Sequence, residues 1–350
     1  MSQTFWISLP AALLTVLGTT SVSHAQIISA GYQGAAASPA EISGKPQQSS
    51  ANFQRLDLTK NKGTFAYSCV AVAPCGTEMT ELRYEVEELM ARYKSLSSGM
   101  LFLDLDTGNY LDLNGSRVFP AASTIKLPIL IAFFQDLDAG KVSLDETWVM
   151  RRNLITNGSG TMQYRRAGTK FTALETVTKM VTISDNTATN MVIDRLGGIA
   201  KLNQRFRSWG LKHTVMRHLL ADLRGTNKTS SQDMVQLMAL LVNNKLVSES
   251  SREQILDILR HTTIKTLLPA GLGAGAAIAN KTGDIGFLVG DAGIINMPNG
   301  KRYLAAIFVR RPYKDPQARH FISKISRLVY NYLEQQLPPR PTLHGHHRRS

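Results

Sequence analysis

The chain of 350 residues is 43% apolar, which is enough to bury one sizeable core and leaves room for a second. It carries 40 Lys and Arg against 26 Asp and Glu. Because only 19% of the residues are charged, the net charge of +14 reflects scarce acids more than abundant bases. These figures exclude collagen, coiled-coil and wholly disordered chains. The bases are scattered, apart from a short run at 340–349, and no nucleic-acid-binding motif accompanies them, so we expect no nucleic-acid partner.

The N-terminus has the pattern of an export signal. The apolar run from Phe5 to Leu17 is too short to span a bilayer, and small residues follow it up to Ala25. The pattern predicts a signal peptide over 1–25, cleaved after Ala25, and an exported, periplasmic or secreted protein without stable membrane insertion. The alternative is an uncleaved anchor, because residues 1–4 contain no Lys or Arg.

Residues 26–76 are rich in Ala, Gly, Ser, Gln and Pro without any helical or strand period, which predicts a flexible linker. The chain has two cysteines, Cys69 and Cys75, near the end of this segment. Two cysteines alone cannot form a tetrahedral zinc site, so we expect no metal. Either a disulfide bond or two free thiols remains possible.

Regular hydrophobic patterns begin after the linker. Apolar residues at helical spacing over 79–93, with glutamates on the opposite side, predict a long amphipathic helix. The runs 100–105 and 110–113 flank a turn-forming cluster and predict a hairpin. The period is then helical from 127 to 259. Three strand-like runs and a last amphipathic helix follow, at 277–281, 291–297, 303–310 and 321–332.

This order of elements predicts an α/β fold of the α+β type. Since sequential strands usually pair, we expect one five-stranded antiparallel sheet flanked by the terminal helices, with an all-helical insertion at about 127–262. The whole domain would extend over 77–338. Residues 339–350 are expected to form a basic, solvated tail.

A Ser-x-x-Lys pattern joins Ser123 to Lys126 ahead of the apolar run 127–134. We expect Ser123 at a helix N-terminus, where unpaired N–H groups and the helix dipole favour negative charge near its hydroxyl. Lys126 lies one turn further on, and a partly desolvated lysine has a pKa low enough to accept the serine proton. The alternative is a helix cap followed by a solvated lysine. Pro128 requires the helix to begin late or to kink.

Two further motifs follow: Ser184-Asp185-Asn186 in the helical block and Lys281-Thr282-Gly283 at the end of an apolar strand. Each alone has an ordinary explanation, a capped helix start for the first and a strand-end turn for the second. The occurrence of all three motifs in this order is far harder to explain by chance than any one of them alone.

In these motifs the chain resembles the class A β-lactamases and the penicillin-binding serine acyltransferases. The resemblance covers roughly Met79 to Leu337 and includes residues 119–120 and 196–198 beside the first two motifs. It implies a sheet domain and a helical domain with the active site in the cleft between them.

The resemblance also implies a role for each motif residue. Ser123 would be the nucleophile, Lys126 its base or proton relay, and Ser184 the group that passes a proton to the leaving nitrogen. The backbone N–H groups of Ser123 and Asp284 would form the oxyanion hole. The substrate-binding residues would be Asn186 for the side-chain amide, Lys281 and Thr282 for the carboxylate, and Gly283 and Asp284 at the end of the strand.

The chain departs from the family in the loop that frees the acyl-enzyme. Class A β-lactamases carry a water-activating glutamate there, whereas this chain has no glutamate between Glu175 and Glu249. The corresponding stretch offers Asp222 as a possible deacylation base, or else a loop-capping aspartate. His218 is a second candidate base.

A second departure is Asp284, which stands where the family commonly has a small or hydroxyl residue. Its carboxylate would repel an anionic substrate unless Lys281 pairs with it. The arginine that many class A enzymes place near this strand has no clear counterpart, because the run 291–297 contains none.

We therefore expect an exported serine hydrolase that opens β-lactam rings through an acyl-enzyme on Ser123, with slow deacylation, no cofactor and a monomeric state. One alternative is a cell-wall D,D-peptidase or related acyltransferase, whose substrate would be a peptidoglycan peptide. Another is a sensor module that stays acylated.

Overall fold

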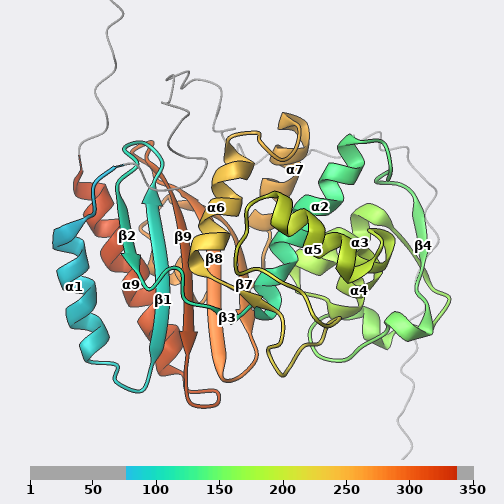
Figure 1. Ribbon diagram of the computed structural model, residues 1–350, viewed down its shortest axis with the longest axis horizontal. Helices are drawn as coiled ribbons and strands as arrows, with labels where there is room; N and C mark the ends of the chain where they lie inside the picture. The colour runs from blue at the N-terminus through green and yellow to red at the C-terminus, as the bar shows by residue number, and fades with distance from the viewer. Residues whose placement is uncertain (1–75, 337–350) are drawn as a thin grey trace, which may run out of the picture. The chain divides into compact units, whose positions relative to one another are not determined.

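The computed structural model describes residues 76–336 and is built around a five-stranded antiparallel sheet. The strand order is β2-β1-β9-β8-β7, so the N-terminal hairpin lies at one edge and β7 at the other (Figure 1). The strands are β1 (Ser97–Asp104), β2 (Tyr110–Leu113), β7 (Ala277–Asp284), β8 (Leu288–Asn296) and β9 (Arg302–Arg310). The predicted fold class is confirmed, with the sheet, the terminal helices and the helical region all present.

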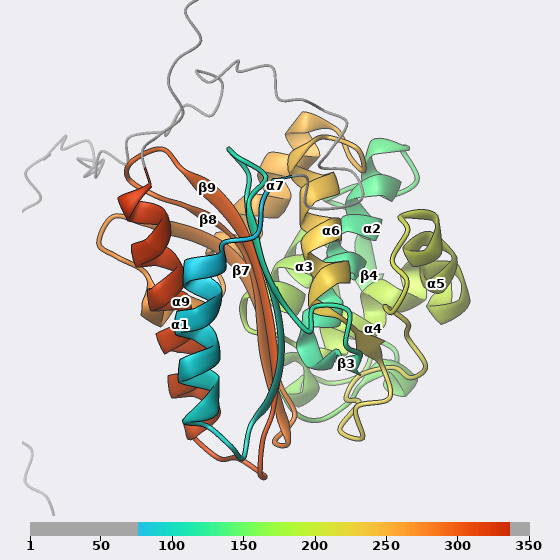
Figure 2. The same ribbon diagram turned by 60° about the vertical axis from the view of Figure 1, so that its left-hand side comes forward.

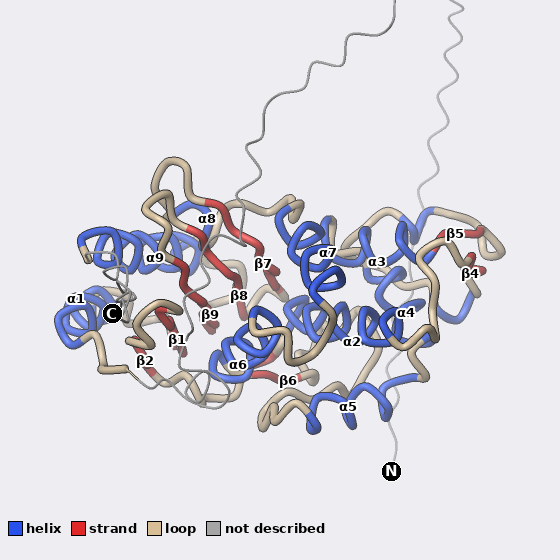
Figure 3. The backbone as a smooth tube through the Cα atoms, turned by 90° about the horizontal axis from the view of Figure 1, so that it is seen from above, coloured by secondary structure: helices blue, strands red, loops and turns tan. Residues whose placement is uncertain are grey.

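The central strands β8 and β9 are buried along almost their whole length. Their sequences are mainly apolar on both faces rather than alternating, as expected for strands covered on both sides, although β8 also contains the buried Asp291. Two layers of helices provide that cover (Figures 2 and 3).

One face of the sheet packs against helices from both ends of the described chain. These are α1 (Thr80–Ala91) and α9 (Gln317–Gln335), with the short α8 (Leu268–Gly271) beside α9 (Figure 2). Val86 of α1 and Ile325 of α9 are fully buried in the core on this side. The helical spacing of apolar residues in both segments produces these faces.

The other face of the sheet carries the remaining helices (Figure 1). These are α2 (Lys126–Asp138), α3 (Ala173–Thr182), α4 (Asn186–Arg195), α5 (Gly198–Ser208), α6 (Ser231–Val242) and α7 (Glu249–Arg260). Helix α2 is apolar on all sides, and its residues from Lys126 to Phe134 are all buried. A helix of this kind belongs in the centre of a bundle.

Short elements connect these helices and brace the loops between them. The small strands are β3 (Phe119–Pro120), β4 (Thr147–Val149), β5 (Lys170–Thr172) and β6 (Lys228–Thr229), pairing as β3 with β6 and β4 with β5. The 3-10 turns are η1 (Ala122–Ile125), η2 (Arg152–Leu154) and η3 (Met162–Tyr164).

Several predicted features lie outside the described residues. They are the signal peptide at 1–25, the linker at 26–76 except for its last residue, Cys69 and Cys75, and the tail at 339–350. Within 76–336, none of the helices is both long and apolar enough to cross a membrane.

Candidate active site

Ser123 lies in the 3-10 turn η1, directly before α2. Ser123 therefore lies at a helical N-terminus, as expected, and the α-helix itself starts three residues later at Lys126, which is the late start that Pro128 allows. This late start places Pro128 in the first turn of α2, where its missing N–H has no intrahelical partner to lose. The loop before Ser123 is fixed by the Ala121 N–H, which donates to the Asn227 carbonyl at 2.8 Å.

Lys126 is fully buried, and its Nζ lies within hydrogen-bonding distance of four oxygens. They are Ser123 Oγ at 3.1 Å, Ser184 Oγ at 3.0 Å, the Ser184 carbonyl at 2.6 Å and Asn186 Oδ1 at 2.9 Å. The first motif and the second, which lies 58 residues further along the chain, thus meet at one amine.

The surroundings of Lys126 favour its neutral form. Burial lowers the pKa of Lys126 well below its ordinary value, the nearby charge of Lys281 lowers it further, and Asp185 partly opposes both effects. A neutral amine has two N–H donors and one lone pair. The Ser184 carbonyl and Asn186 Oδ1 can only accept and so take both donors, which leaves the lone pair for a serine hydroxyl. Lys126 is therefore arranged to receive a proton from Ser123 or Ser184.

The Ser-Asp-Asn motif combines a helix cap with site residues. Asp185 is the N-cap of α4 and accepts from the Ala188 N–H at 2.9 Å. Its other oxygen accepts from the N–H groups of Thr161 and Met162 at 2.7 and 2.8 Å. Ser184 has φ of 58°, a left-handed conformation that costs energy for a residue with a Cβ. The cap thus fixes a strained turn that presents Ser184 to Lys126.

The Lys-Thr-Gly motif occupies the end of the edge strand β7. Lys281 is buried and donates to the Thr282 carbonyl at 2.9 Å. Burial lowers its pKa to about 8, opposed by the charge of Asp291, a buried residue on β8. Burial also raises the pKa of Asp291 to about 6. Lys281 and Lys126 are therefore neighbouring buried lysines with depressed pKa values.

Gly283 allows β7 to lie directly against the nucleophile. A Cβ placed on Gly283 would lie 2.9 Å from both Ala122 Cβ and the backbone nitrogen of Ser123. These distances are shorter than real Cβ contacts, so no larger residue fits without moving the turn. The glycine therefore brings the end of β7, including Asp284, next to Ser123, as the expected oxyanion hole requires.

Asp284 does not pair with Lys281, so the pairing that would offset its repulsion of an anionic substrate is not formed. Its carboxylate accepts from Arg311 Nη2 at 2.7 Å to each oxygen and from Arg319 Nη2 at 2.6 Å. Arg311 follows β9 and Arg319 lies in α9. The run 291–297 contains no arginine, but Arg311 and Arg319, which come from elements outside that run, contact this strand through Asp284. No local sequence signal connects these three residues.

The two candidate deacylation bases occupy different positions in their loop. Asp222 is buried and accepts from Thr226 Oγ1 at 2.8 Å and from the Asn227 N–H at 2.6 Å. His218 is exposed, and its backbone bonds to the side chain of Asn227. Asp222 thus has the contacts of a loop-capping group. Within residues 76–336, no hydrogen bond joins Asp222 or His218 to the Lys126 cluster.

A residue that sequence reasoning missed lies beside the site in the same loop. Leu220 is buried, and its backbone is held at both ends by Asn190 of α4, with distances of 2.9 Å to its N–H and 2.7 Å to its carbonyl. Asn190 lies one helical turn after Asn186. A Cβ built on Gly158 would be 2.8 Å from Asn186 Nδ2 and 3.8 Å from Ala221 Cβ, so the Leu220–Ala221 peptide lies near Asn186. A lone loop leucine gives no functional signal in a sequence.

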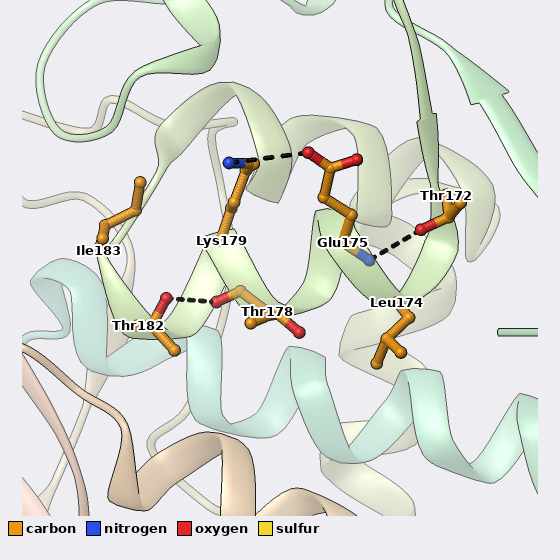
Figure 4. A pocket seen from close by; sticks show the side chains of 7 residues that line it. All are labelled: Thr172, Leu174, Glu175, Thr178, Lys179, Thr182 and Ile183. Atoms are coloured by element: carbon orange, nitrogen blue, oxygen red, sulfur yellow. Dashed lines mark hydrogen bonds and ion pairs between the residues drawn. The ribbon is translucent and has the colours of Figure 1, made fainter. Parts of the chain in front are cut away.

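A separate hollow of about 410 Å³ lies along α3 (Figure 4). Its wall includes Glu175 and Lys179, whose charged groups are 3.7 Å apart. None of the motif residues lines this hollow, so it has no part in the site. Among the described residues, no group of three or more His, Cys, Asp or Glu side chains could hold a metal ion.

The sheet, the helical layer and the clustered serines and lysines define a serine active site of the penicillin-recognising type. The family model described as the beta-lactamase enzyme family matches residues 81–333, most of the chain. The chain therefore belongs to the class A β-lactamase family.

Individual relatives agree with this assignment. The chain is 25% identical to the extended-spectrum β-lactamase PER-1 of Pseudomonas aeruginosa, covering 72% of this chain and 87% of that protein. It is 27% identical to a β-lactamase of Bacillus licheniformis, covering 75% and 91%.

Among solved structures, PBP-A is 50% identical with a TM-score of 0.74, covering 76% of this chain and 100% of that one. A leucine-to-glutamate variant of PBP-A, solved as an acyl-enzyme with penicillin G, is likewise 50% identical, with a TM-score of 0.73 and coverage of 74% and 98%.

Proposed function

We propose that this protein is a penicillin-reactive serine acyl-enzyme that β-lactams acylate at Ser123 and that releases the acyl group slowly. The observation that carries the proposal is the contact of a fully buried Lys126 with the hydroxyls of Ser123 and Ser184. The likeness to PBP-A, which forms an acyl-enzyme with penicillin G as a variant, supports the substrate class.

Acylation would begin when Lys126 Nζ accepts the proton of Ser123 Oγ. The oxygen then attacks the lactam carbonyl, and the N–H groups of Ser123 and Asp284 stabilise the negative charge on the carbonyl oxygen. As the C–N bond breaks, Ser184 gives its proton to the leaving nitrogen and is reprotonated from Lys126. Lysine is neutral again at the end of the step, so it can act once more.

Substrate contacts would come from both sides of Ser123. Asn186 Nδ2 donates to the Asn157 carbonyl at 3.1 Å, and this amide would also hold the acyl side chain of a substrate. On the strand side, Lys281 would supply positive charge and Thr282 a hydroxyl for the substrate carboxylate. The position of both residues on the strand next to Ser123 supports these roles.

Deacylation would be slow because the loop carries the buried Leu220, and not a carboxylate, at the peptide that lies near Asn186. A leucine side chain cannot activate water. Asp222, the candidate base expected from the sequence, already accepts hydrogen bonds from Thr226 and Asn227. We therefore favour Asp222 as a loop cap and expect it to contribute little to hydrolysis.

The missing carboxylate also favours a second candidate function, that of a cell-wall D,D-peptidase or related acyltransferase. Likeness to a penicillin-binding protein at 50% identity supports this candidate over a fast β-lactamase. The substrate would then be a peptide ending in D-Ala-D-Ala, which the same acylation machinery attacks.

Both candidate functions require action on extracytoplasmic substrates. We accordingly propose export with signal cleavage after Ala25 and a monomeric protein. The N-terminal sequence of the protein recovered from the producing cell, and its mass in solution, test these two points.

One experiment separates the candidate functions. Purified protein is mixed with a fluorescent penicillin, a chromogenic cephalosporin and a D-Ala-D-Ala depsipeptide, and labelling and turnover are measured together. We expect one label per chain on Ser123, absent in Ser123→Ala and unchanged in the exposed control Ser116→Ala. Depsipeptide turnover would identify the peptidase, and permanent labelling without any turnover would indicate a sensor. An adduct on another residue would overturn the proposal.

A further inference from the structure

The cluster formed by Asp284, Arg311 and Arg319 lies next to the nucleophile without taking part in the proposed proton transfers. Asp284 directly follows Gly283, whose built Cβ would touch the backbone nitrogen of Ser123. Its side chain is 29% exposed, so its charge is in reach of a bound molecule. Because successive side chains alternate along a strand, the Asp284 side chain points to the face of β7 opposite to that of Gly283, so the cluster lies at the strand end beside the nucleophile without contacting Ser123.

The two arginines of the cluster differ in their freedom. Arg311 is buried, and its remaining donors bond to the carbonyls of Gly286 at 2.8 Å and Asp315 at 2.9 Å. Arg319 is 37% exposed and donates to Asp284 and to Thr266 Oγ1 at 2.9 Å. Arg311 thus anchors the aspartate, whereas Arg319 is the cation that solvent or substrate can reach.

The side chain of Asp284 shares a face of β7 with Thr282, because side chains two apart along a strand point the same way. The separation along the strand is about 7 Å. A substrate carboxylate held by the Thr282 hydroxyl would therefore lie close to both the negative charge of Asp284 and the positive charge of Arg319. The aspartate reduces the attraction that the arginine would otherwise offer.

We propose that Asp284 is a charge-specificity residue: its carboxylate occupies Arg319 and weakens the acylation of this protein by substrates that carry a carboxylate beside the scissile amide. The inference rests on the proposed acylation of Ser123. Lys281 and the two arginines alone would favour anionic over neutral substrates. The inference predicts that Asp284 makes this preference weaker.

The test compares an anionic and a neutral β-lactam of the same shape, penicillin G and its methyl ester. Second-order acylation rates are measured by intact mass for the wild type, Asp284→Asn and Asp315→Asn. Asp315 is a nearby carboxylate that accepts from the Gln317 N–H at 2.8 Å and makes no side-chain contact with Arg319 in the described residues. Asp315→Asn thus controls for a general change of charge.

We expect Asp284→Asn to raise the rate with penicillin G about threefold or more, as removal of a charge about 7 Å from another charge predicts. The methyl ester should change less than twofold, and Asp315→Asn should leave both rates within twofold. The gain should shrink at high salt, and it should disappear when Arg319→Gln is added to Asp284→Asn. Melting curves verify that each variant is folded, and Asp284→Ala repeats the comparison if the asparagine variant is not.

A lower rate with penicillin G in Asp284→Asn, or an equal change with both probes, would overturn the charge inference while leaving acylation of Ser123 in place. Failure of the wild type to be acylated by either probe would instead remove the proposed function and this inference with it. The two failures are therefore distinguishable.

Discussion

The Nζ of Lys126 lies 2.6 Å from the carbonyl oxygen of Ser184, a residue in the left-handed region of backbone conformation. This contact uses one donor of the amine and Asn186 Oδ1 uses another. The strained turn at Ser184 therefore does more than position a hydroxyl. It orients the lone pair of Lys126 toward the serines.

The first prediction concerns the pH dependence of acylation. Because the pKa of Lys126 is lowered well below its ordinary value, its neutral, proton-accepting form persists to lower pH than in an ordinary lysine, and the acylation rate should fall as the pH drops through that pKa. The acid limb of a plot of acylation rate against pH measures this pKa. Lys126→Ala should lower the rate by about 10² to 10⁴. An unchanged rate in Lys126→Ala would remove this residue from the mechanism.

The second prediction concerns the alkaline limb. The pKa of Lys281 is lowered to about 8, so its positive charge is present below that pH and is lost above it. Acylation by anionic penicillin G should decline above about pH 8, whereas the neutral methyl ester should show a weaker decline. Lys281→Arg keeps its charge at these pH values and should remove the difference between the two probes. Parallel profiles for both probes in the wild type would contradict the role of Lys281.

The third prediction tests the close approach of β7 to Ser123. Gly283→Ala should lower the acylation rate at least about tenfold, because the added methyl group collides with backbone at the nucleophile. Gly290→Ala is a matched control, since Gly290 pairs with Gly283 across the sheet and its Cβ would meet Phe308 instead. Both variants should have a free energy of unfolding about 1 to 3 kcal/mol lower than the wild type, which lowers their melting temperatures. Equal acylation rates in the two folded variants would refute the steric argument.

The fourth prediction supplies the missing base. Leu220→Glu places a carboxylate in the loop that Asn190 holds beside the site, and we expect deacylation to accelerate by about 10². Leu220→Gln introduces a side chain of nearly the same shape as glutamate but without its charge, so its deacylation should stay slow. The lifetime of the fluorescent penicillin adduct measures both. Equally long lifetimes in the two variants would show that Leu220 does not face the acyl group.

Much of the fold was predictable from the sequence because its signals are local. The helical spacing that buries Val86 and the apolar runs of β8 and β9 each depend on neighbouring residues. The order of the elements then restricts the sheet to few arrangements. The start of α2 at Lys126 was less predictable, since Pro128 required only a late start or a kink.

The candidate site was predictable where short motifs carry it. Residues that act through distant partners were not. Asp284 bonds to arginines 27 and 35 positions further along the chain, and only the folded structure shows that they meet. Leu220 gave no signal because an apolar loop residue has no chemistry of its own.

The central claim is that this chain acylates readily and deacylates slowly, and stopped-flow hydrolysis of a chromogenic cephalosporin tests it most directly. Acylation would use the buried Lys126 and the serines around it, whereas the described loop carries Leu220 and not a carboxylate at the peptide that lies near Asn186. The account predicts a burst of about one equivalent per protein followed by slow steady hydrolysis, the pattern of an accumulating acyl-enzyme. Fast linear turnover without a burst would contradict it.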